Sequence, residues 1–397
     1  MPEAQEKLIR DLPKADLHVH LDGSLRLKTL IELAQAQNIK LPSYSEDGLR
    51  ELVFKDRYKD LPDYLQGFQY TCAVMKDLEA LERVAYEFAW DCFHDGVIYV
   101  EPRYSPDLLK TEKIKAHEVI HAIDKGLKKA QYEINALIDK ENEALKKDCP
   151  NNFIEHPRFV YSHIICCMRM WEPQRSSDTI NSAIVTKEKY GVPITAIDLA
   201  GPEAGFPAID HQDAYVTAHK HFLYKTVHAG EAYGPSSIFQ AITYLYADRI
   251  GHGFHLFDAD LIHSKDPQTA KRYVNNLVQY IAEKRITLEV CLTSNLQTLP
   301  ELQGNPANHT LPLMLDSGIS IAICTDNTLV SNTTVTKELI LAAKTFNLSA
   351  KQIKKLIMYG IKRSFYPGSY LEKKKYIDVC AKYYDYLVDK GKVLKSS

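Results

Sequence analysis

The chain has 397 residues, of which 45% are hydrophobic and 25% charged, close to the average for a soluble globular protein. Its 49 Lys and Arg nearly balance 51 Asp and Glu, so the net charge of −2 supplies no general attraction to nucleic acid or to an anionic membrane. No apolar run approaches the roughly 18 residues of a membrane span. Because residues 1–15 contain no apolar signal region, we expect a cytoplasmic protein.

Short β-branched runs that end in polar residues recur along the chain and predict strands. In chain order they begin at Ala15, Gly96, Phe159, Ile194, Leu223, Arg249, Ile286 and Ile319. Segments with helical periodicity lie between them, and this alternation predicts βα units and a parallel sheet. Eight such units predict the α/β fold class, as a (β/α)8 TIM barrel.

The first two intervals between strands are longer than the others, so we expect extra helices there. Residues 110–151 are rich in lysine and have a helical pattern, which suggests a solvated flanking helix, and residues 370–395 suggest one or two amphipathic helices outside the barrel. No shift in composition marks a domain boundary. We therefore expect a single domain over residues 1–397. We also expect this chain to be a monomer or weak oligomer.

Residues capable of chemistry follow the predicted strands at their carboxyl ends, which a barrel brings onto one face. They are His18, His20, Asp198, Gly201, His228, Glu231, His252, Asp326 and Asn327. Alternate side chains of a strand point the same way, so both imidazoles of the first pair would face the barrel interior and could bind one cation. By itself, such a pair is also compatible with two histidines on a polar strand end.

The other strand ends leave similar alternatives open. Gly230 permits a turn that would bring Glu231 back toward His228 as an acid or base, although a surface ion pair would look the same. His252 lies between glycines, which suits close approach of a ligand or a buried structural turn. Asp326 follows a buried run, where a carboxylate needs a partner, a metal or a helix to cap. Jointly, three imidazoles and a carboxylate suit Zn²⁺ with an open position for water.

In their order along the chain, these motifs resemble the adenosine deaminases of the metal-dependent hydrolase superfamily. They are HVHLDGSL from His18, VIYVEPRYSP from Val97, CCMR from Cys166, AIDLAGPE from Ala196, TVHAGE from Thr226, RIGHG from Arg249, EVCLTSN from Glu289 and TDN from Thr325. The resemblance implies hydrolysis of adenosine or 2′-deoxyadenosine to the inosine nucleoside and ammonia. The partner it implies is thus a small purine nucleoside.

The resemblance also implies a role for each matching residue. One Zn²⁺ per chain would be bound by His18, His20, His228 and Asp326. Glu231 would protonate purine N1, while His252, with Asp326, would orient the zinc-bound hydroxide toward C6.

The substrate contacts follow from the same resemblance. The backbone N–H of Gly201 would donate to purine N3, and Asp22 would contact a ribose hydroxyl, with His20 beside the substrate. An apolar lid would present Leu61, Tyr64, Leu65 and Phe68 to the pocket, although these side chains also fit an ordinary helix core.

Asn327 departs from the pattern of many family members, which have a second aspartate at this position. That acid is expected to donate to purine N7, which a carboxyl can do only when protonated, whereas an amide N–H donates directly. The change is compatible with purine binding but leaves the substrate open between adenosine, 2′-deoxyadenosine, a 5′-modified adenosine and adenine.

Two unrelated functions compete with this interpretation. His117, Glu118 and His121 match the H-E-x-x-H signature of zinc proteases, but in a lysine-rich helix outside the predicted barrel and without an obvious third ligand. A barrel kept only as a binding module would be expected to have lost a ligand or Glu231, and this chain has them all.

Overall fold

The computed structural model describes residues 3–148 and 153–396. Its centre is a parallel sheet with strands in the order β1-β2-β4-β5-β6-β7-β8-β9, and the short β3 also pairs with β2. The strands are β1 (Lys14–His20), β2 (Val97–Tyr104), β3 (Val160–Tyr161), β4 (His163–Met168), β5 (Ile194–Ala200), β6 (Tyr224–Ala229), β7 (Arg249–His252), β8 (Thr287–Val290) and β9 (Ser320–Ile323).

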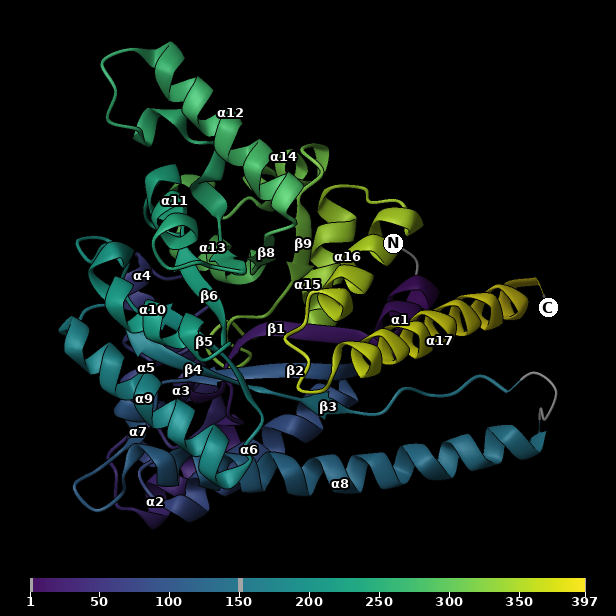
Figure 1. The fold of residues 1–397 in the computed structure, drawn as a ribbon. Helices are drawn as coiled ribbons and strands as arrows, with labels where there is room; N and C mark the ends of the chain where they lie inside the picture. Colours follow the sequence, from purple (N-terminus) through teal and green to yellow (C-terminus); the bar gives the residue numbers. More distant parts are fainter. Residues whose placement is uncertain (1–2, 149–152, 397) are drawn as a thin grey trace.

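The sheet closes on itself between its first and last strands. Val19 forms a parallel bridge with Asp326, just beyond β9. The backbone N–H of His20 donates to the carbonyl of Asp326 at 2.7 Å, and the N–H of Asp326 donates to the carbonyl of His18 at 2.8 Å. With helices around the strands (Figure 1), this closure confirms the predicted (β/α)8 TIM barrel.

Helices cover the outer face of the barrel, so the strands are buried on both faces, and even charged strand residues such as Arg103 and Glu289 are inaccessible to solvent. The α-helices are α1 (Glu3–Asp11), α2 (Leu27–Ala36), α3 (Glu46–Leu52), α4 (Leu61–Leu65), α5 (Phe68–Val74), α6 (Leu78–His94), α7 (Pro106–Leu109), α8 (Ala116–Asp148), α9 (Pro173–Tyr190), α10 (Gln212–Lys220), α11 (Pro235–Thr243), α12 (Pro267–Lys284), α13 (Leu292–Thr298), α14 (Leu311–Asp316), α15 (Val335–Thr345), α16 (Ala350–Lys362) and α17 (Tyr370–Ser396). Short 3₁₀ helices are η1 (Leu21–Gly23), η2 (Ala208–His211), η3 (Phe254–Phe257), η4 (Ala259–Leu261), η5 (Pro300–Leu302) and η6 (Pro306–Asn308).

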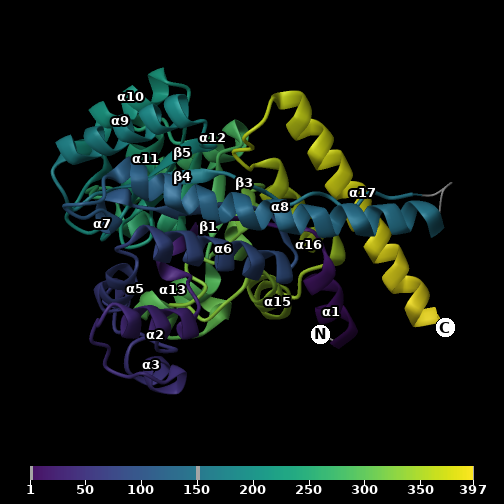
Figure 2. The ribbon, with the colours of Figure 1, turned by 90° about the horizontal axis from the view of Figure 1, so that it is seen from below.

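The extra helices lie in the first two intervals, as expected: α2 to α6 between β1 and β2, and α7 and α8 between β2 and β4. Helix α8 runs along α6 and extends beyond the barrel (Figure 2). The expectation of a solvated helix is correct for one face only, because Val119, Ile123, Leu127 and Ile134 belong to the main hydrophobic core. Residues 149–151 of the predicted segment lie outside the described residues.

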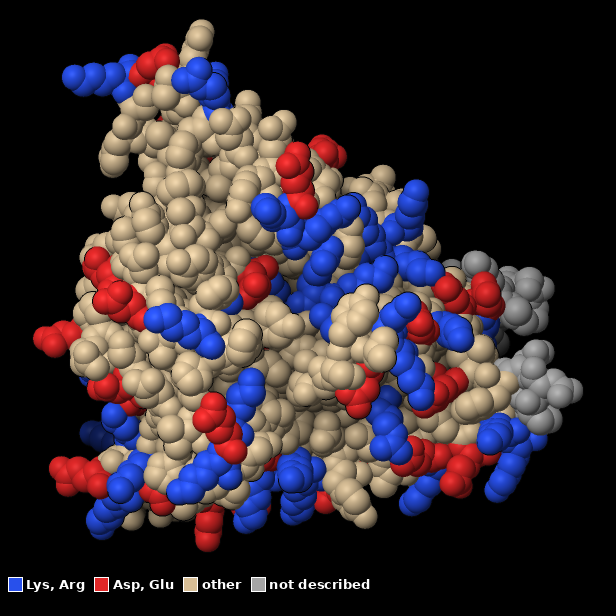
Figure 3. All heavy atoms as spheres, viewed as in Figure 1, with Lys and Arg blue, Asp and Glu red and all other residues tan. Residues whose placement is uncertain are grey.

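The predicted C-terminal segment forms the single helix α17, whose Tyr376 and Cys380 are buried against residues of β1, β2 and α16. On the face shown in Figure 3, acidic and basic side chains are interspersed, with one gathering of Lys and Arg around α16. Within the described residues, no helix has both the length and the apolar character needed to cross a membrane.

Candidate active site

The carboxyl ends of the barrel strands and the segments after them enclose a cavity of about 230 Å³. The predicted site residues that line it are His20, Asp22, Leu61, Tyr64, Leu65, Phe68, Gly201, His228, Glu231, His252, Asp326 and Asn327. His18 is fully buried, with its ring 5.5 Å from that of His20. The fold therefore brings together residues that lie more than three hundred positions apart in the sequence.

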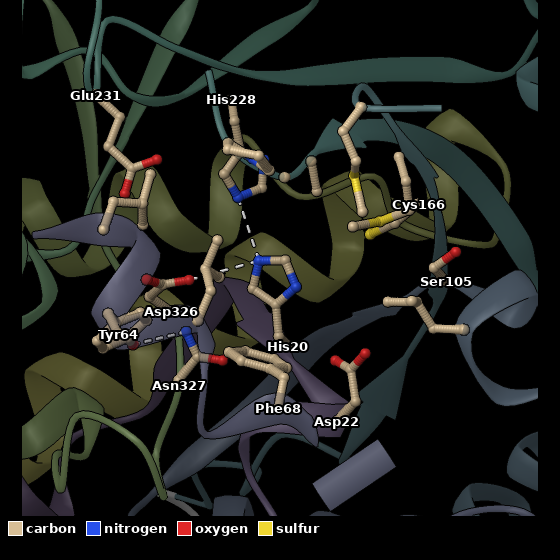
Figure 4. A pocket seen from close by; sticks show the side chains of 18 of the residues that line it. His20, Asp22, Tyr64, Phe68, Ser105, Cys166, His228, Glu231, Asp326 and Asn327 are labelled. Atoms are coloured by element: carbon tan, nitrogen blue, oxygen red, sulfur yellow. Dashed lines mark hydrogen bonds and ion pairs between the residues drawn. The ribbon is translucent and has the colours of Figure 1, made fainter. Parts of the chain in front are cut away.

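Three imidazoles and one carboxylate converge beside this cavity. Among the described side chains, His18, His20, His228 and Asp326 are the only group of three or more with metal-ligand spacing, and their ligand atoms lie within 4.8 Å of one another. The Nε2 atoms of His18 and His20 each lie 3.4 Å from Asp326 Oδ1, and His20 Nε2 lies 3.2 Å from His228 Nε2. Figure 4 shows the two contacts of His20.

These separations fit a small tetrahedral cation. Ligand bonds of about 2.1 Å place tetrahedral ligand atoms roughly 3.4 Å apart. His18 Nε2 is buried and has no hydrogen-bond partner, which is costly for an acceptor nitrogen unless a cation binds it. The donor set, three nitrogens and one carboxylate oxygen, is one that zinc accepts.

Buried carboxylates orient two of the imidazoles from behind. Glu289 Oε2 lies 2.8 Å from His18 Nδ1, and Asp198 Oδ2 lies 3.0 Å from His228 Nδ1. With these Nδ1–H groups donating to the carboxylates, each Nε2 keeps its lone pair for the shared centre. The hydroxyl of Ser294 donates to the second oxygen of Asp326 at 2.6 Å, which leaves Oδ1 facing the imidazoles.

A layer of buried charges lies beneath the four candidate ligands. The guanidinium of Arg103 donates to Asp198 at 3.0 Å and to Glu289 at 2.9 Å, and Arg249 donates to Glu289 at 2.6 Å and also pairs with Glu101. Burial alone would raise the pKa of Glu289, but the two guanidinium groups hold that pKa well below its usual range. Against the effect of burial, His228 and Arg103 also hold the pKa of Asp198 well below its usual range, so both carboxylates behind the imidazoles stay ionised.

Two site residues have a left-handed backbone that non-glycine residues rarely adopt, with φ of 65° at His252 and 62° at Asp326. A side chain at Gly251, before His252, would place its Cβ 2.9 Å from the His18 ring. Such strained conformations cost on the order of 1–3 kcal/mol each and persist where the surroundings enforce them, typically at functional sites.

Glu231 and His252 lie side by side in the cavity wall, with 3.6 Å between Oε1 and Nε2. Both are almost completely buried. Burial raises the pKa of the Glu231 carboxyl to about 8, so it carries a proton at neutral pH. Burial also lowers the pKa of the His252 imidazole well below its usual value. The amide nitrogen Nδ2 of Asn295 lies 3.3 Å from Nδ1 of the same imidazole.

Glu203 anchors the loop that carries Glu231. Its carboxylate accepts hydrogen bonds from the backbone N–H groups of residues 230–233, at 2.7 to 3.1 Å, and from the hydroxyl of Ser237. Glu203, Glu289 and Ser294 are not among the site residues predicted from the sequence. All three lie within the motifs that carry the family resemblance, and this position was the one sign in the sequence that they belong to the site.

The predicted substrate contacts also face the cavity. Burial raises the pKa of Asp22 to about 7, and its Oδ1 has no hydrogen-bond partner. Leu61, Leu65 and Phe68 line the cavity from α4 and α5 while packing against the main core, so the lid and core interpretations both describe them.

The histidines of the H-E-x-x-H motif lie elsewhere, on α8. The rings of His117 and His121 are 6.0 and 6.2 Å from the ring of Tyr190, in the neighbouring helix α9. Neither lines the cavity at the strand ends.

Comparison with known proteins identifies the family. The sequence model of the adenosine deaminase family matches residues 13–383. An adenosine deaminase of Clostridium acetobutylicum is 31% identical over 363 residues, covering 91% of this chain and 95% of that protein. A probable adenosine deaminase of Dictyostelium discoideum is 34% identical over 359 residues, or 90% of this chain and 41% of that longer protein.

A solved structure shares the fold. The crystal structure of an amidohydrolase from Burkholderia ambifaria, with bound Zn, superposes with a TM-score of 0.76 at 20% identity, covering 99% of this chain and 96% of that one. By its sequence, its barrel and its relatives, this chain belongs to the adenosine deaminase family of metal-dependent hydrolases and is a hydrolytic deaminase.

Proposed function

We propose that this chain converts adenosine and 2′-deoxyadenosine, with water, to inosine and 2′-deoxyinosine and ammonia, using one Zn²⁺ bound by His18, His20, His228 and Asp326. The observation that carries the proposal is the convergence of these four ligand atoms within 4.8 Å, beside a cavity that Glu231 also lines. When bound, zinc supplies an activated water at neutral pH.

The residues of the chain supply the remaining steps. Carbon C6 of an aromatic purine is a poor electrophile, and a proton donated by Glu231 to N1 makes it open to attack. His252 and Asp326 orient the attacking water toward C6. As the C6 carbonyl forms, the water gives up both its protons, one to the amino group, which leaves as ammonia, and one back to Glu231. Because charge develops in a buried site, these fixed groups act with little solvent screening.

The cavity wall positions the nucleoside. We assign the backbone N–H of Gly201 to purine N3, the Asn327 amide to N7, and Asp22 with His20 to the ribose side. The apolar side chains Leu61, Tyr64, Leu65 and Phe68, which line the cavity, serve to exclude bulk water.

The charges in the cavity favour an uncharged nucleoside over a nucleotide. None of the lining residues is Lys or Arg, and the residue we assign to the ribose side, Asp22, offers no positive charge. A 5′-phosphate would therefore be buried without a cationic partner, and burying a charge that no opposite charge compensates costs several kcal/mol.

A substrate panel tests the proposal. Ammonia release is measured with adenosine, 2′-deoxyadenosine, 5′-substituted adenosines, adenine and AMP. We expect the two nucleosides to be turned over, with kcat/KM for AMP lower by on the order of 100-fold or more. Release from AMP or adenine as fast as from adenosine would refute the assignment. We also propose that the chain acts as a single domain, as a monomer or weak oligomer, in the cytoplasm.

A further inference from the structure

A chain of hydrogen bonds joins the lid to the loop that follows β9. The amide nitrogen of Asn327 donates to the hydroxyl of Tyr64, in α4, at 2.8 Å, and that hydroxyl lies 2.7 Å from the hydroxyl of Ser331 (Figure 4 shows the first contact). All three side chains are almost completely buried, and both Tyr64 and Asn327 line the cavity.

The chemistry of the groups sets the direction of these bonds. An amide NH₂ can only donate, so the Tyr64 oxygen accepts from Asn327 and its own proton is available to Ser331. The amide has two N–H bonds, and Tyr64 uses one. The second N–H remains for an acceptor in the cavity.

The other side of the amide is confined by the backbone. A Cβ added at Gly23 would lie 1.8 Å from Asn327 Oδ1, so this oxygen is packed directly against the glycine. The backbone N–H of Leu329 donates to the carbonyl of the same glycine at 3.1 Å, which ties the two loops together. With Gly23 on one side and Tyr64 on the other, the amide plane has little freedom to rotate.

We propose that Tyr64 is a positioning residue: it holds the Asn327 amide so that the second N–H donates to the N7 acceptor of the purine. Because Tyr64 belongs to α4, recognition of the base then depends on the position of this helix. This inference rests on the proposed function, which assigns Asn327 to N7. A carboxylate at position 327 would accept from Tyr64 and have no proton to offer the base. Tyr64 and Asn327 therefore act as a matched pair in this chain.

Binding of a ligand with and without the N7 acceptor tests the inference. Dissociation constants of inosine and of 7-deazainosine, which has C–H in place of N7, are measured by calorimetry on the zinc-loaded protein. We expect the unchanged protein to bind inosine about tenfold more tightly, as one neutral hydrogen bond allows. In Tyr64→Phe this preference should fall to about twofold, because the amide loses the group that orients it.

Tyr58→Phe is the matched control. Tyr58 packs edge-on against Tyr64 with ring centres 5.0 Å apart, but its hydroxyl donates to the carbonyl of Val330 at 3.1 Å and not to Asn327. Its removal should leave the preference for inosine unchanged. Ser331→Ala keeps the Tyr64 ring and removes the last member of the chain, so it should reduce the preference in the same direction.

The outcomes separate this inference from the proposed function. If Tyr64→Phe and Ser331→Ala weaken binding of both ligands by the same factor, Tyr64 only packs against the site and the positioning role is refuted. If the unchanged protein shows no preference for inosine, the contact between Asn327 and N7 is refuted together with the inference. Absence of deamination alone would refute the proposed function while leaving the calorimetric result to decide the role of Tyr64.

Discussion

Replacing Glu203 by glutamine changes the hydrogen bonds that hold the Glu231 loop while preserving the size of the side chain. The glutamine oxygen can still accept from the N–H groups of residues 231–233, but its NH₂ group then faces the N–H of Gly230, which is left unpaired. The hydroxyl of Ser237 can turn and accept instead.

The expected cost follows from this count. One unpaired buried donor costs about 1–3 kcal/mol, and the loss of charge from the three remaining bonds removes roughly 1–2 kcal/mol more. For a chain of 397 residues the unfolding entropy is about 0.8 kcal/mol per kelvin, so the midpoint of thermal unfolding should fall by about 2–6 °C. Displacement of the acid by even a fraction of an ångström should also lower kcat/KM by about tenfold or more.

Thermal unfolding and steady-state deamination, the latter measured well below the unfolding midpoint, are compared with those of Asp124→Asn. Asp124 is also a buried carboxylate, paired with Tyr161 at 2.8 Å and His163 at 3.1 Å, but it lies on α8, away from the cavity. This control should lose stability and keep kcat/KM. If Glu203→Gln loses stability but keeps full kcat/KM, the loop does not depend on Glu203 for its catalytic geometry.

Three further predictions concern the proton donor and the metal. Glu231→Gln should keep one zinc per chain but lower kcat by about 10²–10⁴-fold. Since burial raises the pKa of this carboxyl to about 8, kcat/KM of the unchanged protein should fall as pH rises through that value. A flat alkaline profile, or near-normal turnover of the variant, would exclude Glu231 as the proton donor. Asp198→Asn should weaken zinc binding by about 10–100-fold in chelator competition, because His228 loses the partner that orients it, and an unchanged affinity would contradict that role. His228→Ala should lose zinc in elemental analysis and His117→Ala should retain it; the reverse result would place the metal on α8.

Much of the fold was predictable because it depends on local patterns. Alternating apolar runs and helical segments indicated the barrel strands, and the polar residues at their ends indicated which face carries the site. The two-residue period of a strand was enough to place His18 and His20 on one side. The high lysine content of α8 favoured the prediction of a solvated helix. One face of this helix is instead apolar and buried, and it contains Val119 and Ile123.

The partners of the ligands were not predictable in the same way. His18 and Glu289 are 271 positions apart, and Asn327 and Tyr64 are 263 apart, so neither pairing has a local signature. Glu203 accepts hydrogen bonds from the N–H groups of the Glu231 loop, but α10 and β6 lie between this residue and the loop in the sequence.

By itself, the sequence determined the succession of strands and helices and the chemical groups at the strand ends, since both follow from side-chain periodicity and residue type. Only the tertiary structure decided which carboxylate orients which imidazole and which side chain holds the Asn327 amide. It also decided from which backbone N–H groups Glu203 accepts hydrogen bonds. Hydrogen bonds require their atoms to meet within a few tenths of an ångström. That precision arises only when barrel closure sets the register between distant strands.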